Sequence, residues 1–220
     1  MSISAWHFLP NDCRLANGDG RKIKPGSIVK IKGKPDLCNH GLHASTRLLD
    51  ALGYAPGNIL CRVSVSGDVV HGDDKLAGTV REVHWILDAD WYLHEFACRV
   101  AEQCLKKHKV TDKRYWSAIA TKRAWLDGHA DDDDLSAAWG AARDAARDAA
   151  WGAARGAAWG AACGAACGAA RGAAWGAARG AARGAACDAA RGAAWGAAWG
   201  AARDSQNKML TRLINTAKWT

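Results

Sequence analysis

Alternating apolar and polar residues in the N-terminal part of the chain predict a β-sheet, because alternation places successive side chains on opposite faces of a strand. Ser27–Lys32 and Ile59–Val65 alternate, Ala5–Leu9 is a short apolar strand candidate, and a further strand is predicted at Val80–Leu87. In the last run, Val83, Trp85 and Leu87 are predicted to share one face. Turn residues predict a chain reversal at Asn17-Gly18-Asp19-Gly20, and Gly67-Asp68 is predicted to end the third strand.

Apolar residues at helical spacing predict helices between and after these strands. Ser45 or Thr46 can cap a short helix that ends at Gly53, and a longer helix begins at Asp90 and ends among lysines. A further helix spans about Asp112–Leu126, and the acidic run 131–134 can cap the N–H groups of the helix that follows it. The predicted fold class is therefore α+β, with a small mixed α/β head followed by helices.

A four-residue repeat fills most of the remaining chain. From Ala137 to Asp204 the unit Ala-Ala-x-Gly/Asp occurs seventeen times, and x is Trp six times, Arg eight times and Cys three times. The fourth position is Gly thirteen times and Asp four times, and no Leu, Ile, Val, Met or Phe occurs in the segment. An ordinary aliphatic core is excluded, so the segment must pack through backbone proximity and indole faces or remain unpacked.

The repeat period favours helices that associate. Thirteen Gly in place of Ala would cost an isolated helix roughly 10 kcal/mol, so such a helix needs a partner. Four residues turn a helix by about 400°, and Gly-x-x-x-Gly spacing lets two helices approach closely. The predicted interface consists of the repeat glycines Gly152, Gly156, Gly160, Gly164, Gly168, Gly172, Gly176, Gly180 and Gly184. A silk-like β-stack and a disordered tract remain alternatives.

Composition and charge divide the chain into a nearly neutral part and a basic part. Residues 1–136 hold 19 Lys and Arg against 18 Asp and Glu, whereas residues 137–220 hold 11 against 4. The predicted organisation is a head at 1–110, a connecting helix with its acidic cap at 111–134, the repeat arm at 135–204 and a helical tail at 205–220. A polyanionic partner would therefore be expected to bind the arm and the tail.

Arg and Trp side chains in the repeat arm suggest nucleic-acid binding as one alternative function. Arginines can contact phosphates and indoles can stack on bases. The candidate residues are Arg155, Arg171, Trp175, Arg179, Arg183 and Arg191. Packing of these side chains on neighbouring helices, with repeat aspartates pairing with arginines, is the competing interpretation.

A group of potential metal ligands lies in the head. Cys38, His40 and His43 are close in sequence, and Cys13 could add a fourth donor to a tetrahedral zinc site. Their spacing matches no common zinc motif, so a turn with hydrogen-bonded polar side chains is the favoured interpretation. No metal and no cofactor is predicted.

The same region resembles a family of uncharacterised phage and bacterial proteins. The resemblance rests on the segment 37–45, read as Cys-x-x-Gly-Leu-His-Ala-Ser from Cys38, on the Asp50–Tyr54 helix segment, and on the strand that runs to Gly67. Some members of that family carry Ala-rich tails with Trp and Arg. The resemblance implies a phage or prophage setting and no particular activity.

The order of elements around Gly41-Leu42-His43-Ala44 is also similar to that of ADP-ribosyltransferases. That likeness implies an enzyme in which a later Glu activates the acceptor, with His43 and Glu82 as the candidate catalytic residues. His43 stands where those enzymes have Tyr, which puts the likeness in doubt.

Together these patterns predict a non-enzymatic phage-type interaction or assembly protein that forms a homo-oligomer through the repeat arm. Nucleic acid or a host protein is a possible further partner. The longest uncharged stretch of the repeat, Gly156–Ala170, has 15 residues and is too short to cross a bilayer. The start of the chain lacks the pattern of a signal peptide, so a cytoplasmic location is expected, in the host cell if the protein is phage-encoded.

Overall fold

The structure, a computed structural model, describes residues 2–15, 20–37, 39–107, 109–149 and 186–217. The described residues form an α+β fold with two compact units. The head unit consists of Met1–Ala97 together with Arg203–Thr220, and the helical unit consists of Cys98–Ala202. The C-terminal segment thus belongs to the same unit as the N-terminal strands.

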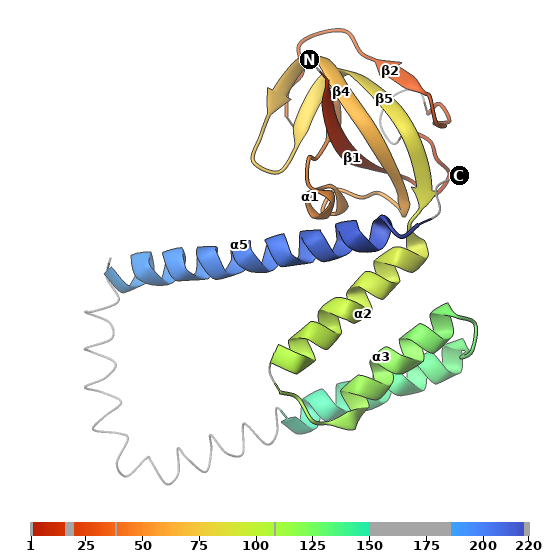
Figure 1. Cartoon of the computed structure of the whole chain (residues 1–220), viewed down its shortest axis with the longest axis vertical. Helices are drawn as coiled ribbons and strands as arrows, with labels where there is room; N and C mark the ends of the chain where they lie inside the picture. Colours follow the sequence, from red (N-terminus) through yellow and green to blue (C-terminus); the bar gives the residue numbers. More distant parts are fainter. Residues whose placement is uncertain (1, 16–19, 38, 108, 150–185, 218–220) are drawn as a thin grey trace. The chain divides into compact units, whose positions relative to one another are not determined.

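The head unit is built on an antiparallel sheet (Figure 1). Its strands in the described chain are β1 (Ile3–Leu9), β2 (Ile28–Lys30), β3 (Leu42–Ala44), β4 (Ile59–His71) and β5 (Leu76–Asp88). The strand order is β1-β4-β5-β2, and β3 also pairs with β5. The predicted strands at 5–9, 59–65 and 80–87 lie within β1, β4 and β5, whereas β2 covers only Ile28–Lys30 of the predicted 27–32. The predicted reversal at 17–20 lies outside the described residues except for Gly20.

Two predicted details of the long β4–β5 hairpin are wrong. β4 does not end at Gly67 but continues to His71. Gly67, whose φ is +79°, lies in a register irregularity between Ser66 and Val69, and the strand pairing resumes after it. Val83, Trp85 and Leu87 do not share a face. The pairs Arg62–Trp85 and Val63–Val83 leave His84 as an extra residue, and such a bulge moves the following side chains to the other face.

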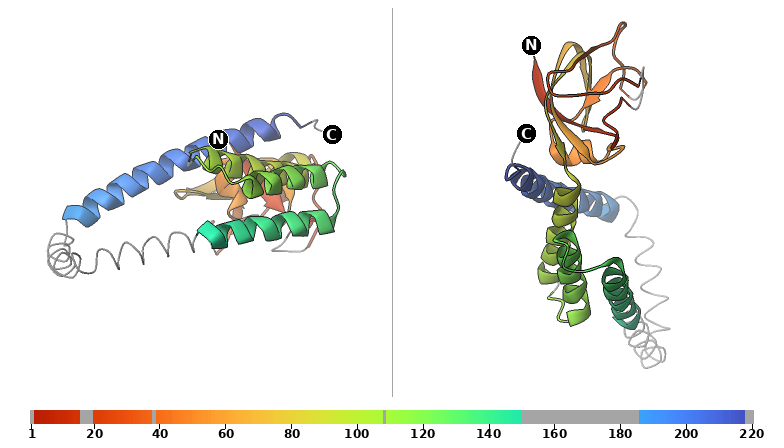
Figure 2. Two further views of the ribbon diagram at one scale, coloured as in Figure 1. Left: turned by 90° about the horizontal axis from the view of Figure 1, so that it is seen from below. Right: turned by 90° about the vertical axis from the view of Figure 1, so that its right-hand side faces the viewer.

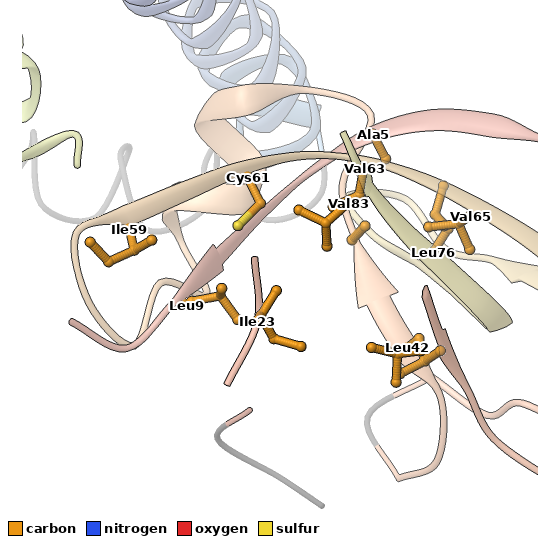
Figure 3. Close-up of a cluster of buried hydrophobic side chains, with 12 residues drawn as sticks. Ala5, Leu9, Ile23, Leu42, Ile59, Cys61, Val63, Val65, Leu76 and Val83 are labelled. Carbon is orange, nitrogen blue, oxygen red and sulfur yellow. The ribbon is translucent and has the colours of Figure 1, made fainter. Parts of the chain in front are cut away.

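One face of the sheet forms the hydrophobic core. Register pairs such as Ala5–Val63 and Leu9–Ile59 place β1 and β4 side chains on this face. Figure 3 shows these side chains in one cluster with those of Ile23 and Leu42, two residues that do not belong to β1 or β4. Cys61, Val63 and Val65 have no exposed surface. β-branched and other apolar side chains at every second position account for this buried cluster.

The opposite face of the sheet is also apolar near β1. Phe8 and Leu60 are register partners there, and they are 2% and 0% exposed. Helix α1 (Leu48–Leu52) packs against β1. The predicted Ser45 or Thr46 cap of α1 is wrong, since Arg47 occupies the N-cap position and makes no side-chain cap hydrogen bond. The predicted end of this helix at Gly53 is confirmed.

Helices form the rest of the described chain, and Figure 2 shows them from two further sides. They are α2 (Asp90–Lys107), α3 (Lys113–Leu126), a helix at 132–149 and α5 (Ala186–Ile214). Asp112 caps α3 by accepting a hydrogen bond from the Arg114 backbone N–H. Asp131 Oδ1 accepts one from the Asp134 N–H at 2.8 Å, so the predicted acidic cap is confirmed.

The described ends of the repeat arm are helical, while 150–185 lie outside the described residues. Within the described chain, no helix has the length and apolar character needed to span a membrane.

Candidate functional site

The head unit contains a cavity of about 430 Å³. It lies between β1, β3, β5 and the segment around α1. Its polar lining residues are His7, His43, Ser45, Tyr54, Lys75 and Arg81. Its apolar walls come mainly from Trp6, Phe8, Pro10, Leu15, Leu42, Ala44, Ala51 and Pro56. A concave, mostly apolar site with a few polar groups is typical of small-molecule binding.

Arg81 is the most deeply buried charged group of the cavity. It pairs with Val29 and Val65 in the sheet register, so it faces the core, and it is 3% exposed. Its Nη1 donates to the His43 backbone carbonyl at 2.8 Å, whereas its buried Nε has no hydrogen-bond partner among the described residues. Burial lowers the pKa of Arg81 to about 10, which still leaves the guanidinium charged at pH 7.

The buried Cys61 thiol, which interacts electrostatically with Arg81, does not neutralise this charge. Burial raises the pKa of the Cys61 thiol to about 12, against the opposing effect of Arg81, so the thiol stays protonated at pH 7. Cys61 is also free rather than disulfide-bonded. The structure therefore places an arginine cation in the core beside the cavity with a neutral thiol as its neighbour.

Two histidines share the cavity with Arg81. Burial lowers the pKa of His7 well below its usual value, and the positive charge of Arg81 lowers it further. Burial also lowers the pKa of His43, with Lys75 as the next cause. Both imidazoles are therefore neutral at pH 7 and can serve as hydrogen-bonding groups.

A lysine, a tyrosine and an aspartate form a contact at one part of the cavity wall. The Lys75 Nζ lies 4.5 Å from the centroid of the Tyr54 ring, and the Tyr54 hydroxyl donates to Asp74 Oδ2 at 2.6 Å. The hydrogen bond to Asp74 raises the pKa of Tyr54. Lys75 and Arg81 are the strongly basic lining groups, and no Asp or Glu occurs among the described lining residues.

Gly41 shapes the backbone next to the cavity. Its φ is +147°, and a Cβ at this position would lie 2.8 Å from the Ala77 Cβ. Only glycine combines this conformation with so close an approach of β5. Gly41 thereby sets the course of β3, which carries His43.

The structure separates the two candidate catalytic residues. His43 lines the cavity, but Glu82 is exposed and pairs with Ile28, which is 53% exposed. Glu82 follows the core-facing Arg81 in the strand, so it lies on the other face of β5. The geometry gives the transferase alternative no support.

The potential metal ligands of the head are not gathered in the described residues. His40 is exposed, and its Nε2 donates to the Lys32 carbonyl at 2.8 Å, while Cys13 is half-buried. Cys38 lies outside the described residues. In the part of the chain that the structure describes, no group of three or more His, Cys, Asp or Glu could hold a metal ion.

A second candidate site is the C-terminal contact, formed by Arg203, Asp204 and Asn207 with Arg47, Leu49 and Asp50. Arg203 Nη2 lies 2.6 Å from Asp50 Oδ1, and Arg47 Nη2 lies 2.8 Å from Asp204 Oδ1. The Leu49 backbone N–H donates to Asn207 Oδ1 at 3.0 Å. Arg203 and Asp204 end the repeat, so its last unit is bound to the loop and helix at α1 (Figure 1).

Apolar burial reinforces the C-terminal contact. Leu210 and Ile214 are 0% exposed, and Leu213 and Ala217 are almost as deeply buried. Burial of a Leu or Ile side chain contributes roughly 1.5–3 kcal/mol. This segment is therefore part of the folded head unit.

The start of the repeat makes a comparable contact in the helical unit. Asp148, the fourth residue of a repeat unit, accepts a hydrogen bond from Arg114 Nη1 of α3 at 2.7 Å. Arg114 also binds Asp112, and the two carboxylates raise the pKa of the guanidinium. Repeat aspartates at both ends of the arm thus pair with arginines outside the repeat.

Most of the predicted arm residues lie outside the described residues. This applies to the nine interface glycines at 152–184 and to Arg155, Arg171, Trp175, Arg179 and Arg183. Arg191 falls within α5. Of the described repeat glycines, Gly140 and Gly200 would have nothing within 4 Å of an added Cβ among the described residues.

Sequence reasoning missed Arg81, His7 and Lys75. The signal for Arg81 is a charged residue at a core position of the alternating run Val80–Leu87. A charge on the apolar face of a predicted strand is unusual and points to a buried cation.

The cavity lies in the part of the chain that is similar to a known family model. Residues 5–95 match a family model described as a domain of unknown function (DUF7666). No curated protein and no solved structure matches the chain. All the lining residues of the cavity fall inside the matched range, whereas Arg203, Asp204 and Asn207 fall outside it.

Proposed function

We propose that the protein is a non-enzymatic interaction protein of phage type that self-associates through its repeat arm, and that its folded units hold the two ends of this arm. The observation that supports this proposal most directly is the pairing of repeat aspartates with arginines outside the repeat. Asp148 binds Arg114, and Asp204 binds Arg47. The phage setting rests on the family resemblance of the head.

The positions of Asp and Gly in the repeat distinguish the part of the arm that binds the folded units from the part that we assign to self-association. Asp occupies the fourth position at 144, 148, 188 and 204, and the nine units from Gly152 to Gly184 all carry Gly there. Asp148 and Asp188 therefore flank an acid-free run of glycines, and Asp148 is one of the two repeat aspartates that bind arginines outside the repeat. Glycine at every fourth residue permits close helix approach, and this run is the surface that we assign to self-association.

The test replaces Gly172, Gly176 and Gly180 by Leu, which inserts side chains at the proposed contact. We expect the parent protein to sediment as an oligomer and the triple variant to dissociate, although each change raises helix propensity by most of a kcal/mol. Trp175→Leu is the matched control and should affect assembly less. Trp175 occupies the x position of the repeat, which lies about 100° around the helix from the glycine. Equal assembly of the triple variant and the parent would refute the proposal.

Nucleic-acid binding by the arm is the second candidate, and one described residue pair favours it. Trp139 is 66% exposed, and the Arg143 guanidinium lies 5.8 Å from its ring centroid. An exposed indole beside a cation can stack on a base and contact a phosphate. Titration with single-stranded oligonucleotides should then show binding that weakens when Arg171, Arg179 and Arg183 are replaced by Gln. Lack of any complex at low salt would remove this candidate.

A further inference from the structure

We infer that the head cavity binds a small organic anion, which presents a carboxylate or phosphate oxygen to Arg81 and an apolar body to the walls around it. This inference is independent of self-association by the repeat arm.

The first argument is the uncompensated charge of Arg81. A charged group inside a protein is normally paired, because removing a charge from water is costly. Arg81 is 3% exposed, and its Nη1 donates to the uncharged His43 carbonyl. Its buried Nε lacks a hydrogen-bond partner among the described residues. An oxyanion that accepts from this guanidinium would supply both the missing charge and the missing acceptor.

The second argument is the balance of charge around the cavity. Lys75 and Arg81 line it, and the lining residues include no carboxylate in the described part of the chain. Asp74 holds the Tyr54 hydroxyl and is not a lining residue. An anion entering the cavity therefore meets two cations and the hydrogen-bonding groups of His7 and His43, with no like charge on the wall.

The third argument is the size and polarity of the walls. The cavity of about 430 Å³ lies within the range of small-molecule sites. Pro10, Leu15, Leu42 and Pro56 contribute apolar surface. A bare inorganic ion would leave this surface wet, so an organic acid or phosphate with an apolar group fits better than the ion alone.

Equilibrium dialysis of the full chain tests the inference with three probes: benzoate, its neutral isostere benzamide, and inorganic phosphate. We expect benzoate to bind and benzamide to bind at least about tenfold more weakly, since a charge-assisted hydrogen bond is lost. Binding of phosphate alone would assign the site to phosphate-bearing ligands and still support an anion site. Failure of both anions to bind at about 10 mM would overturn the inference.

Variants separate the cavity from the basic arm, which can also attract anions. Arg81→Met should weaken anion binding about tenfold or more, while Lys30→Met, at an exposed position of β2, should leave it unchanged. Equal affinity of Arg81→Met and the parent would overturn the inference. If circular dichroism shows that Arg81→Met does not fold, Lys75→Met decides the question. Severalfold weaker binding by that variant supports the cavity site, and unchanged binding refutes it.

Discussion

At the residue scale, a single glycine fixes the backbone beside the cavity. Gly41 has a φ of +147° and leaves 2.8 Å between an added Cβ and the Ala77 Cβ. We expect Gly41→Ala to lower the free energy of unfolding by about 1–3 kcal/mol, through backbone strain and through displacement of β5. Denaturant unfolding followed by circular dichroism measures this loss.

Gly26 provides the matched control for that substitution. Its φ is +80°, but an added Cβ would have nothing within 4 Å among the described residues. Gly26→Ala should therefore cost only the backbone term, about 1–2 kcal/mol. A Gly41→Ala variant no less stable than Gly26→Ala would show that the close approach to Ala77 is unimportant.

The cavity histidines make the stability of the head depend on pH. The folded-state pKa of His7 lies below its unfolded value, since burial and Arg81 disfavour the imidazolium, so the unfolded chain binds the proton more readily. Stability is therefore full above the ordinary histidine pKa of about 6.5 and falls as the pH decreases below it. His43 acts in the same direction through burial, Lys75 and Arg81.

We expect His7→Gln to reduce the fall in unfolding free energy between about pH 7 and pH 5, because it removes one of the groups that must be protonated. His71→Gln, at an exposed position of β4, is the matched substitution for comparison. Urea unfolding at several pH values gives the comparison. An unaltered pH slope in His7→Gln would contradict the assignment of the effect to this side chain.

At the element scale, the C-terminal end of α5 completes the head. Leu210 is 0% exposed although it lies more than a hundred residues from the strands in sequence. Leu210→Ala should lower the unfolding free energy of the head by about 2–5 kcal/mol, because a cavity forms in a packed interior. Met209→Ala, at the half-buried neighbouring position, should cost less. Similar losses for both variants would show that the segment does not pack as a buried element.

Local pattern predicted most elements but not their nonlocal contacts. Apolar and alternating runs located β1, β4 and β5 and overlapped the shorter β2, and helical spacing located α2 and α3. β3 has three residues and is too short to show a period. The bulge at His84 depends on pairing with β4, which no local pattern reports, and it reversed the predicted faces of Trp85 and Leu87.

The candidate site was harder to predict than the fold. His43 was identified from the sequence, but its cavity partners His7, Lys75 and Arg81 come from three different strands or strand connections. Only the sheet register brings them together. The C-terminal contact was equally hidden, because the pairs Arg203–Asp50 and Asp204–Arg47 join segments about 150 residues apart.

At the scale of the whole molecule, self-association should determine how much of the repeat arm is helical. The thirteen repeat glycines make an isolated arm helix unfavourable by roughly 10 kcal/mol relative to alanine, so helical arms need contacts between copies. The head and the helical unit have contacts of their own, including the core around Val63 and the Arg123–Glu102 pair. Their contribution to the spectrum should not depend on concentration.

Dilution of the full-length protein should therefore lower the helical signal at the concentrations where sedimentation shows the oligomer dissociating. The loss should stop at a plateau set by the head and the helical unit. The variant with Leu at 172, 176 and 180 should show a helical signal independent of concentration, because it has lost the contact while gaining intrinsic propensity. If the parent dissociates with no change in helicity, its arm helix is stable in a single copy, and the glycine repeat must have a role other than helix association.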